Sequence, residues 1–256
     1  MKMQRLAFWI SLVALFLGSA SIASADLEVR MGGQAVYDTD LDTTWVSDAN
    51  LALTNQFGLT LSGSEFDETP NTVGSTGLVT WENANAWIAG MNAANHLGFN
   101  DWRLPTTSDP DTSCTTDPEG TMPITGGAGG YNCVGSEMGH LIYVELGGTP
   151  GSNLVLTSDP AELAKFTNLT STDPYIGWSG EFALNPATFA WTFEFISGQE
   201  LASAKVNTVR VWAIRSGDVG GAAAVPVADL PARIALTLVL FALGFVTLSR
   251  RSGVRI

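Results

Sequence analysis

The chain is poor in the residues that most enzymes use for chemistry. It contains two histidines and two cysteines, and it has no Gly-x-Ser-x-Gly motif. His96 and His140 are far apart in the sequence and do not by themselves form a metal-ligand motif or a catalytic base. If Cys114 pairs with Cys133, no thiol is free for nucleophilic catalysis. These absences predict a protein that is not an enzyme.

Positive charge is also scarce. Residues 26–220 contain six basic and 24 acidic side chains, which gives a formal charge of −18. A field of this sign repels nucleic acid, anionic lipid headgroups and sulfated polysaccharide. The sequence therefore excludes a nucleic-acid partner and is compatible with divalent cations.

Long apolar runs occur only at the two ends of the chain. At the amino end, a basic start precedes a 12-residue apolar run (6–17) and an Ala-x-Ala ending at Ala25. Twelve helical residues reach about 18 Å, which is short of the ~30 Å hydrocarbon layer. The pattern predicts a signal peptide at residues 1–25 that is cleaved after Ala25.

The carboxyl end has a longer apolar stretch. Residues 230–249 carry one charge, Arg233, and they precede a basic segment at 250–256. A helix of this length nearly spans the hydrocarbon layer, and the basic residues indicate the cytoplasmic side. We expect a transmembrane helix at 230–249, a cytoplasmic tail at 250–256 and a linker at 219–229. A buried core helix is the alternative, but the stretch has no amphipathic face.

The segment between the ends, residues 26–218, is expected to form one domain. Its first helix is predicted to begin at the N-cap Thr80, and a second at Ser136. Each shows apolar residues at helical spacing, in one case Trp81, Ala84, Trp87, Ile88 and Met91, in the other Met138, Leu141, Ile142, Glu145 and Leu146. Period-2 patterns at 189–196 and 209–215 predict strands. The expected fold class is α+β, with two helices, short antiparallel strands and long loops.

The two cysteines enclose a loop rich in glycine, proline and threonine. An even number of cysteines in an exported domain predicts one disulfide, Cys114–Cys133, formed in an oxidising compartment. Closing a loop of about 20 residues is worth about 3 kcal/mol. A reactive or metal-binding thiol pair is the alternative, but the spacing matches no zinc pattern.

Several strings together resemble one known family. The segment GLVTWENANAWIAGMNAANHLGFNDWRLPT combines a Trp-led helix with an Asp-Trp-Arg-Leu-Pro turn, and YDTDLDTTWVSDANL, GSEMGHLIYVELGG, YIGWSGEF, AWTFEF and VRVWAIRSGD accompany it. They resemble the Legionella collagen-like protein C-terminal (Lcl_C) domain family over residues 34–218. The residues Tyr175-Ile176-Gly177-Trp178 depart from it, because they separate a usually adjacent aromatic pair. The resemblance implies a C-type-lectin-like fold. The member that names the family binds sulfated glycans through positive charge, which a charge of −18 opposes.

The tail resembles a second class. Val225-Pro226, an apolar helix and an arginine cluster are similar to a PEP-CTERM sorting signal of the Val-Pro type. This resemblance implies an exosortase-type processing enzyme as partner, in bacteria that make exopolysaccharide. A simple single-pass membrane anchor is the alternative.

Two sets of residues are candidates for binding. Asp38, Asp40 and Asp42 could supply oxygen ligands to Ca²⁺, although Thr43 and Ala49 stand where an EF-hand loop needs Gly and Glu. A solvated turn is the alternative, and no other cofactor is expected.

Trp102 and Arg103 form the second set. They could contact a ligand, or Arg103 could instead fasten a loop through carboxylates and carbonyls while Trp102 fills the core. His140 is interpreted as a packed polar residue that orients the second helix.

These patterns predict a non-enzymatic, exported cell-surface module that binds glycan or contributes to the extracellular matrix. We expect the domain to lie outside the cytoplasm, anchored in the inner membrane or released to the surface. An envelope adhesion protein that contacts other proteins is the alternative, and an enzyme on a lectin-like fold is the least favoured.

Overall fold

The computed structural model of the chain describes residues 27–108, 111–115, 129–169, 176–181 and 185–220. Every helix and strand named below belongs to one unit that ends at Gly217. The predicted signal peptide (1–25), apolar helix (230–249) and basic tail (250–256) lie outside the described residues. Among the residues that are described, no helix is long and apolar enough to cross a bilayer.

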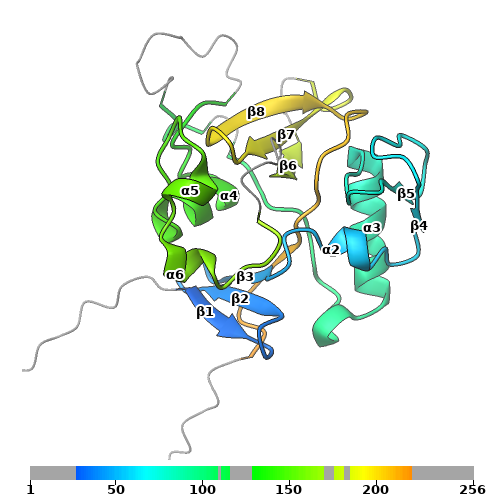
Figure 1. Cartoon of the computed structure of the whole chain (residues 1–256), viewed down its shortest axis with the longest axis horizontal. Helices are drawn as coiled ribbons and strands as arrows, with labels where there is room; N and C mark the ends of the chain where they lie inside the picture. Colours follow the sequence, from blue (N-terminus) through cyan, green and yellow to red (C-terminus); the bar gives the residue numbers. More distant parts are fainter. Residues whose placement is uncertain (1–26, 109–110, 116–128, 170–175, 182–184, 221–256) are drawn as a thin grey trace, which may run out of the picture. The chain divides into compact units, whose positions relative to one another are not determined.

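The first sheet is antiparallel and joins the two ends of the domain. Its strands are β1 (Leu27–Arg30), β2 (Ala35–Asp38), β3 (Thr43–Val46) and β9 (Ile214–Ser216), in the order β1-β2-β3-β9. The β1–β2 hairpin turns at Gly32 and Gly33, which both have positive φ, a backbone conformation that glycine adopts at no steric cost. In Figure 1, this sheet combines the dark blue start of the described chain with its orange end.

Two smaller sheets complete the β structure. The antiparallel sheet β6-β7-β8 consists of β6 (Ile176–Glu181), β7 (Phe189–Glu194) and β8 (Gln199–Ala204), drawn in yellow in Figure 1. Two-residue strands β4 (Thr60–Leu61) and β5 (Thr72–Val73) pair in parallel. They lie within a polar, glycine-rich segment that gave no strand pattern.

The first predicted helix is confirmed as α3 (Trp81–Ala93). Thr80 is its N-cap, and the Thr80 hydroxyl accepts a hydrogen bond from Asn83 N at 3.2 Å. Every residue of the predicted apolar stripe is buried. Because the cap and the stripe are local properties, a single stretch of sequence was enough to place this helix.

The second predicted helix is shorter and wider than expected. Ser136 is the N-cap as predicted, accepting from Gly139 N at 3.1 Å, but α4 (Glu137–His140) is a single turn. A π-helical turn, η3 (Leu141–Glu145), follows it, and Leu146 N donates to Leu141 O at 2.9 Å. The remaining helical segments are short: α2 (Leu51–Thr54), η2 (His96–Gly98), α5 (Leu154–Thr157) and α6 (Pro160–Leu163).

The expected fold class was therefore wrong. We predicted an α+β domain with two helices and a C-terminal transmembrane helix. The structure is instead a β-rich domain with three sheets, in which α3 is the one described helix longer than five residues. The strand predicted at 209–215 is reduced to β9, which begins at Ile214; residues 209–213 lie in non-strand backbone and are all buried.

Tryptophans form much of the core. Trp45, Trp87, Trp178, Trp191 and Trp212 are each at most 1% exposed. The Trp212 indole N–H donates to Val46 O at 2.6 Å, and that of Trp178 donates to Val79 O at 2.9 Å. Each of these acceptors replaces the hydrogen bond to water that a buried indole N–H loses. These bonds tie the late part of the chain to the first sheet and to the start of α3.

Candidate functional site

The Asp-Trp-Arg-Leu-Pro turn is fixed to α3 through Trp102. Its side chain is 2% exposed, and its indole N–H donates to His96 O at 3.0 Å. The Asn92 side chain bonds both the N–H and the carbonyl of Trp102, each at 2.8 Å. Trp102 therefore fills the core in this structure, and a ligand contact through it stays a prediction.

Arg103 binds the start of α4. Its guanidinium donates two hydrogen bonds of 2.6 Å to the Glu137 carboxylate, and a third of 3.1 Å to Leu104 O. The Thr106 amide also donates to Glu137 at 2.6 Å. Burial opposes ionisation of Glu137, but the bonds from Arg103 and Thr106 outweigh it and lower the pKa of this carboxyl. Arg103 therefore connects the Asp-Trp-Arg-Leu-Pro turn to the start of the second helix, which is a structural role.

Arg103→Ala should lower the free energy of unfolding by about 2 kcal/mol, because two charge-assisted hydrogen bonds are lost at a partly exposed site. Glu137→Gln should have a smaller effect and should also change the acid response. Because folding lowers the pKa of Glu137, its stabilisation is present above its unfolded pKa and is lost as the pH falls through the folded pKa. Urea denaturation at neutral and acidic pH measures both effects. Equal acid sensitivity of the wild type and E137Q would contradict a lowered pKa of Glu137 in the folded protein.

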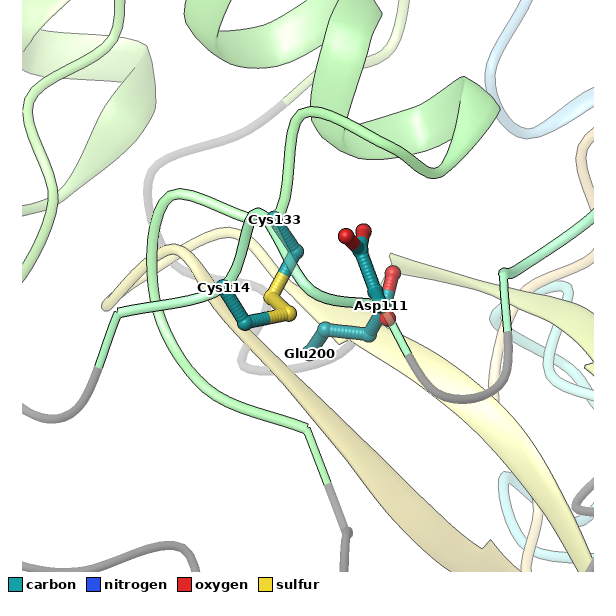
Figure 2. A group of neighbouring side chains, drawn as sticks. All are labelled: Asp111, Cys114, Cys133 and Glu200. Atoms are coloured by element: carbon teal, nitrogen blue, oxygen red, sulfur yellow. A yellow bond between two sulfur atoms is a disulfide. The ribbon is translucent and has the colours of Figure 1, made fainter.

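The predicted disulfide is confirmed. Cys114 and Cys133 are bonded to each other, so neither sulfur is a metal-binding thiolate (Figure 2). Next to the disulfide, Thr115 and Tyr131 pair as an antiparallel bridge, and Gly130 pairs with Glu200 of β8. The disulfide thus closes its loop at the point where that loop joins the β6-β7-β8 sheet.

Two carboxylates flank the disulfide, as Figure 2 shows. Asp111 Oδ1 accepts hydrogen bonds from the Ser113 amide at 2.8 Å and the Ser113 hydroxyl at 2.6 Å. Glu200 is fully buried on β8, and its ligand atoms lie within 4.8 Å of those of Asp111 and the two cysteines. Because the sulfurs are consumed in the disulfide, only the two carboxylates keep ligand capacity here.

The three aspartates proposed as Ca²⁺ ligands lie in the β2–β3 hairpin and do not converge. Asp38 is the last residue of β2 and is fully buried, whereas the Asp40 side chain is 48% exposed. Asp42 accepts a hydrogen bond from the Tyr37 hydroxyl at 2.8 Å. Binding of Ca²⁺ by this run stays a prediction, but the three side chains do not form a single ligand set.

Asp38 instead meets two residues of the second helix. Its carboxylate, the His140 imidazole and the Glu145 carboxylate each offer a ligand atom within 4.8 Å of the other two. Burial raises the pKa of Asp38, although the Leu41 amide opposes this shift. The Glu145 carboxylate raises the pKa of His140, against the effect of burial. Sequence reasoning missed this group, because about a hundred residues separate its two halves.

A hollow lies on the surface beside β8. Its volume is about 570 Å³, and its lining includes Phe66, Glu68, Leu201, Asn207 and Thr208. The Phe66 side chain is 66% exposed, an unusual position for a large apolar ring. Phe66 lies outside every element that was predicted from the sequence, so this hollow was not anticipated.

The tryptophan core, the disulfide and the excess of acidic side chains define a small β-rich module suited to an oxidising compartment. The chain belongs to the Lcl C-terminal domain family, whose model matches residues 34–215. This confirms the resemblance to that family found in the sequence, and it indicates an exported or surface-associated protein. The resemblance of the tail to a sorting signal stays a prediction. No curated protein and no solved structure matches the chain. The likeness to C-type-lectin-like folds stays a prediction.

Proposed function

We propose that this protein is a non-enzymatic surface module that binds an uncharged saccharide in the hollow beside β8. The observation that carries the proposal is the exposed ring of Phe66 in a hollow that also contains Glu68, Asn207 and Thr208. The proposed partner is a glycan of the extracellular matrix.

The chemistry of the hollow suits a sugar. An aromatic face packs against the C–H groups of a pyranose ring, while carboxylate, amide and hydroxyl groups bond to its hydroxyls. A volume of about 570 Å³ lies within the range of small-ligand sites. The formal charge of −18 over residues 26–220 disfavours sulfated or uronic-acid polymers, so a neutral sugar is the better candidate.

The test is a glycan array probed with the full-length chain, followed by calorimetry with the strongest neutral binder. Phe66→Ala should weaken binding about tenfold, because the stacking contact is worth about 1.5 kcal/mol. Leu156→Ala is the matched control, since Leu156 is 75% exposed and does not line the hollow. Silence on the array, or equal affinity of the wild type and F66A, would refute the proposal.

A further inference from the structure

The group formed by Asp38, His140 and Glu145 is well shielded from solvent. Asp38 is fully buried, and the side chains of Glu145 and His140 are 3% and 14% exposed. His140 Nε2 lies 3.4 Å from Glu145 Oε1 and 3.8 Å from Asp40 Oδ2. The ligand atom of Asp38, at the end of β2, lies within 4.8 Å of those of His140 and Glu145. Carboxylates therefore approach one imidazole from both the β2–β3 hairpin and the π-helical turn.

The facing atoms of this group lack hydrogen bonds. Asp38 Oδ2, His140 Nε2 and Glu145 Oε1 are buried, and within the described ranges of the chain none has a hydrogen-bond partner. Leaving a buried polar atom unpaired costs about 1–3 kcal/mol, and more when the group is charged. Because each of the three side chains offers a ligand atom within 4.8 Å of the other two, a single partner can reach all of them. A bound cation is the partner that suits two carboxylates and an imidazole.

The backbone holds these side chains in place. Asp38 Oδ1 accepts from the amides of Asp40 and Leu41, each at 3.0 Å, which leaves Oδ2 for the group. His140 and Glu145 are five residues apart, a spacing that lies on different faces of an α-helix. The π-helical turn η3 widens the helix and brings them together, and such turns are frequent at functional sites.

We propose that Asp38, His140 and Glu145 bind one divalent transition-metal ion, with Zn²⁺ as the best match. Ligand atoms about 2.1 Å from a tetrahedral zinc lie about 3.4 Å apart, which is the distance between His140 Nε2 and Glu145 Oε1. The imidazole disfavours Ca²⁺, which takes six to eight oxygen ligands. Asp40 or water completes the shell. The ion links the β2–β3 hairpin to the second helix, and this proposal does not depend on saccharide binding.

The test uses the full-length chain without a polyhistidine tag, stripped with EDTA and titrated with ZnCl₂ in a calorimeter. We expect one equivalent to bind and the thermal unfolding midpoint to rise with zinc concentration. Bound Co²⁺ should give the visible absorption of a tetrahedral site. Asp38→Asn and Glu145→Gln should weaken zinc binding at least about 100-fold, the upper end of the loss caused by removing an outer-sphere partner alone.

Asp42→Asn is the matched control, because it removes a carboxylate from the same hairpin but not from the group. The amide keeps an acceptor for the Tyr37 hydroxyl, and Asn tolerates the positive φ of 50° at this position. If D38N does not fold, as judged by circular dichroism, E145Q and H140Q decide the question. Absence of zinc binding by the wild type, or equal binding by every variant, overturns the proposal.

Discussion

Trp212→Ala should lower the free energy of unfolding by about 4 kcal/mol, which is a large part of the roughly 5–15 kcal/mol that stabilises a typical domain. The side chain is 1% exposed and packs against Trp45 and Phe166 at centroid distances of 5.0 and 5.3 Å. Its removal leaves a large cavity and deprives Val46 O of its indole donor. Urea denaturation followed by tryptophan fluorescence measures the loss.

Two variants make this result interpretable. Trp212→Phe keeps most of the ring volume but removes the N–H, so it should lose about 2 kcal/mol. Phe66→Ala removes an aromatic ring that is 66% exposed and should change stability by less than about 0.5 kcal/mol. A cost for W212A similar to that of F66A would show that Trp212 does not lie in the core.

Replacing both cysteines, Cys114→Ala with Cys133→Ala, should cost about 3 kcal/mol. The disulfide spans a sequence separation of 19, and opening it returns chain entropy to the unfolded state. It also releases the contact of the loop with β8 through Gly130 and Glu200. Hydrogen exchange should therefore increase in β8 before it increases in the first sheet.

A reducing agent provides the control for this prediction. Dithiothreitol should lower the urea midpoint of the wild-type chain to nearly that of the double variant, and it should leave the double variant unchanged. Two free thiols in the oxidised wild-type protein, measured with a thiol reagent, would contradict the disulfide.

The features that sequence reasoning placed correctly are local. The N-cap Thr80 and the stripe that follows it define α3 without any knowledge of the rest of the fold, and Ser136 marks the start of the second helix in the same way. The disulfide could be predicted from the even number of cysteines and the expected oxidising compartment alone. The stripe from Met138 to Leu146 is buried as predicted, but a spacing of three and four could not reveal the π-helical turn inside it.

The features that sequence reasoning missed depend on contacts between segments that are far apart in the chain. Residues 209–213 are all buried, so the alternation of their side chains does not reflect one buried and one exposed face of a strand. The Asp-x-Asp-x-Asp run was considered as one Ca²⁺-binding loop or a solvated turn, whereas in the hairpin Asp42 bonds to Tyr37 and Asp38 faces the second helix. Only the packing of β2 against the second helix unites Asp38 with His140 and Glu145. The hollow beside β8 likewise joins residues from two segments more than a hundred positions apart.

The pairing of β3 with β9 has a consequence for how the protein is made. Thr43 lies opposite Ser216, so one edge of β3 has no partner until nearly the whole domain exists. A polypeptide that is synthesised, or threaded through a channel, amino end first must wait for its last strand before this sheet closes. A product truncated before residue 214 would expose a bare strand edge and self-associate.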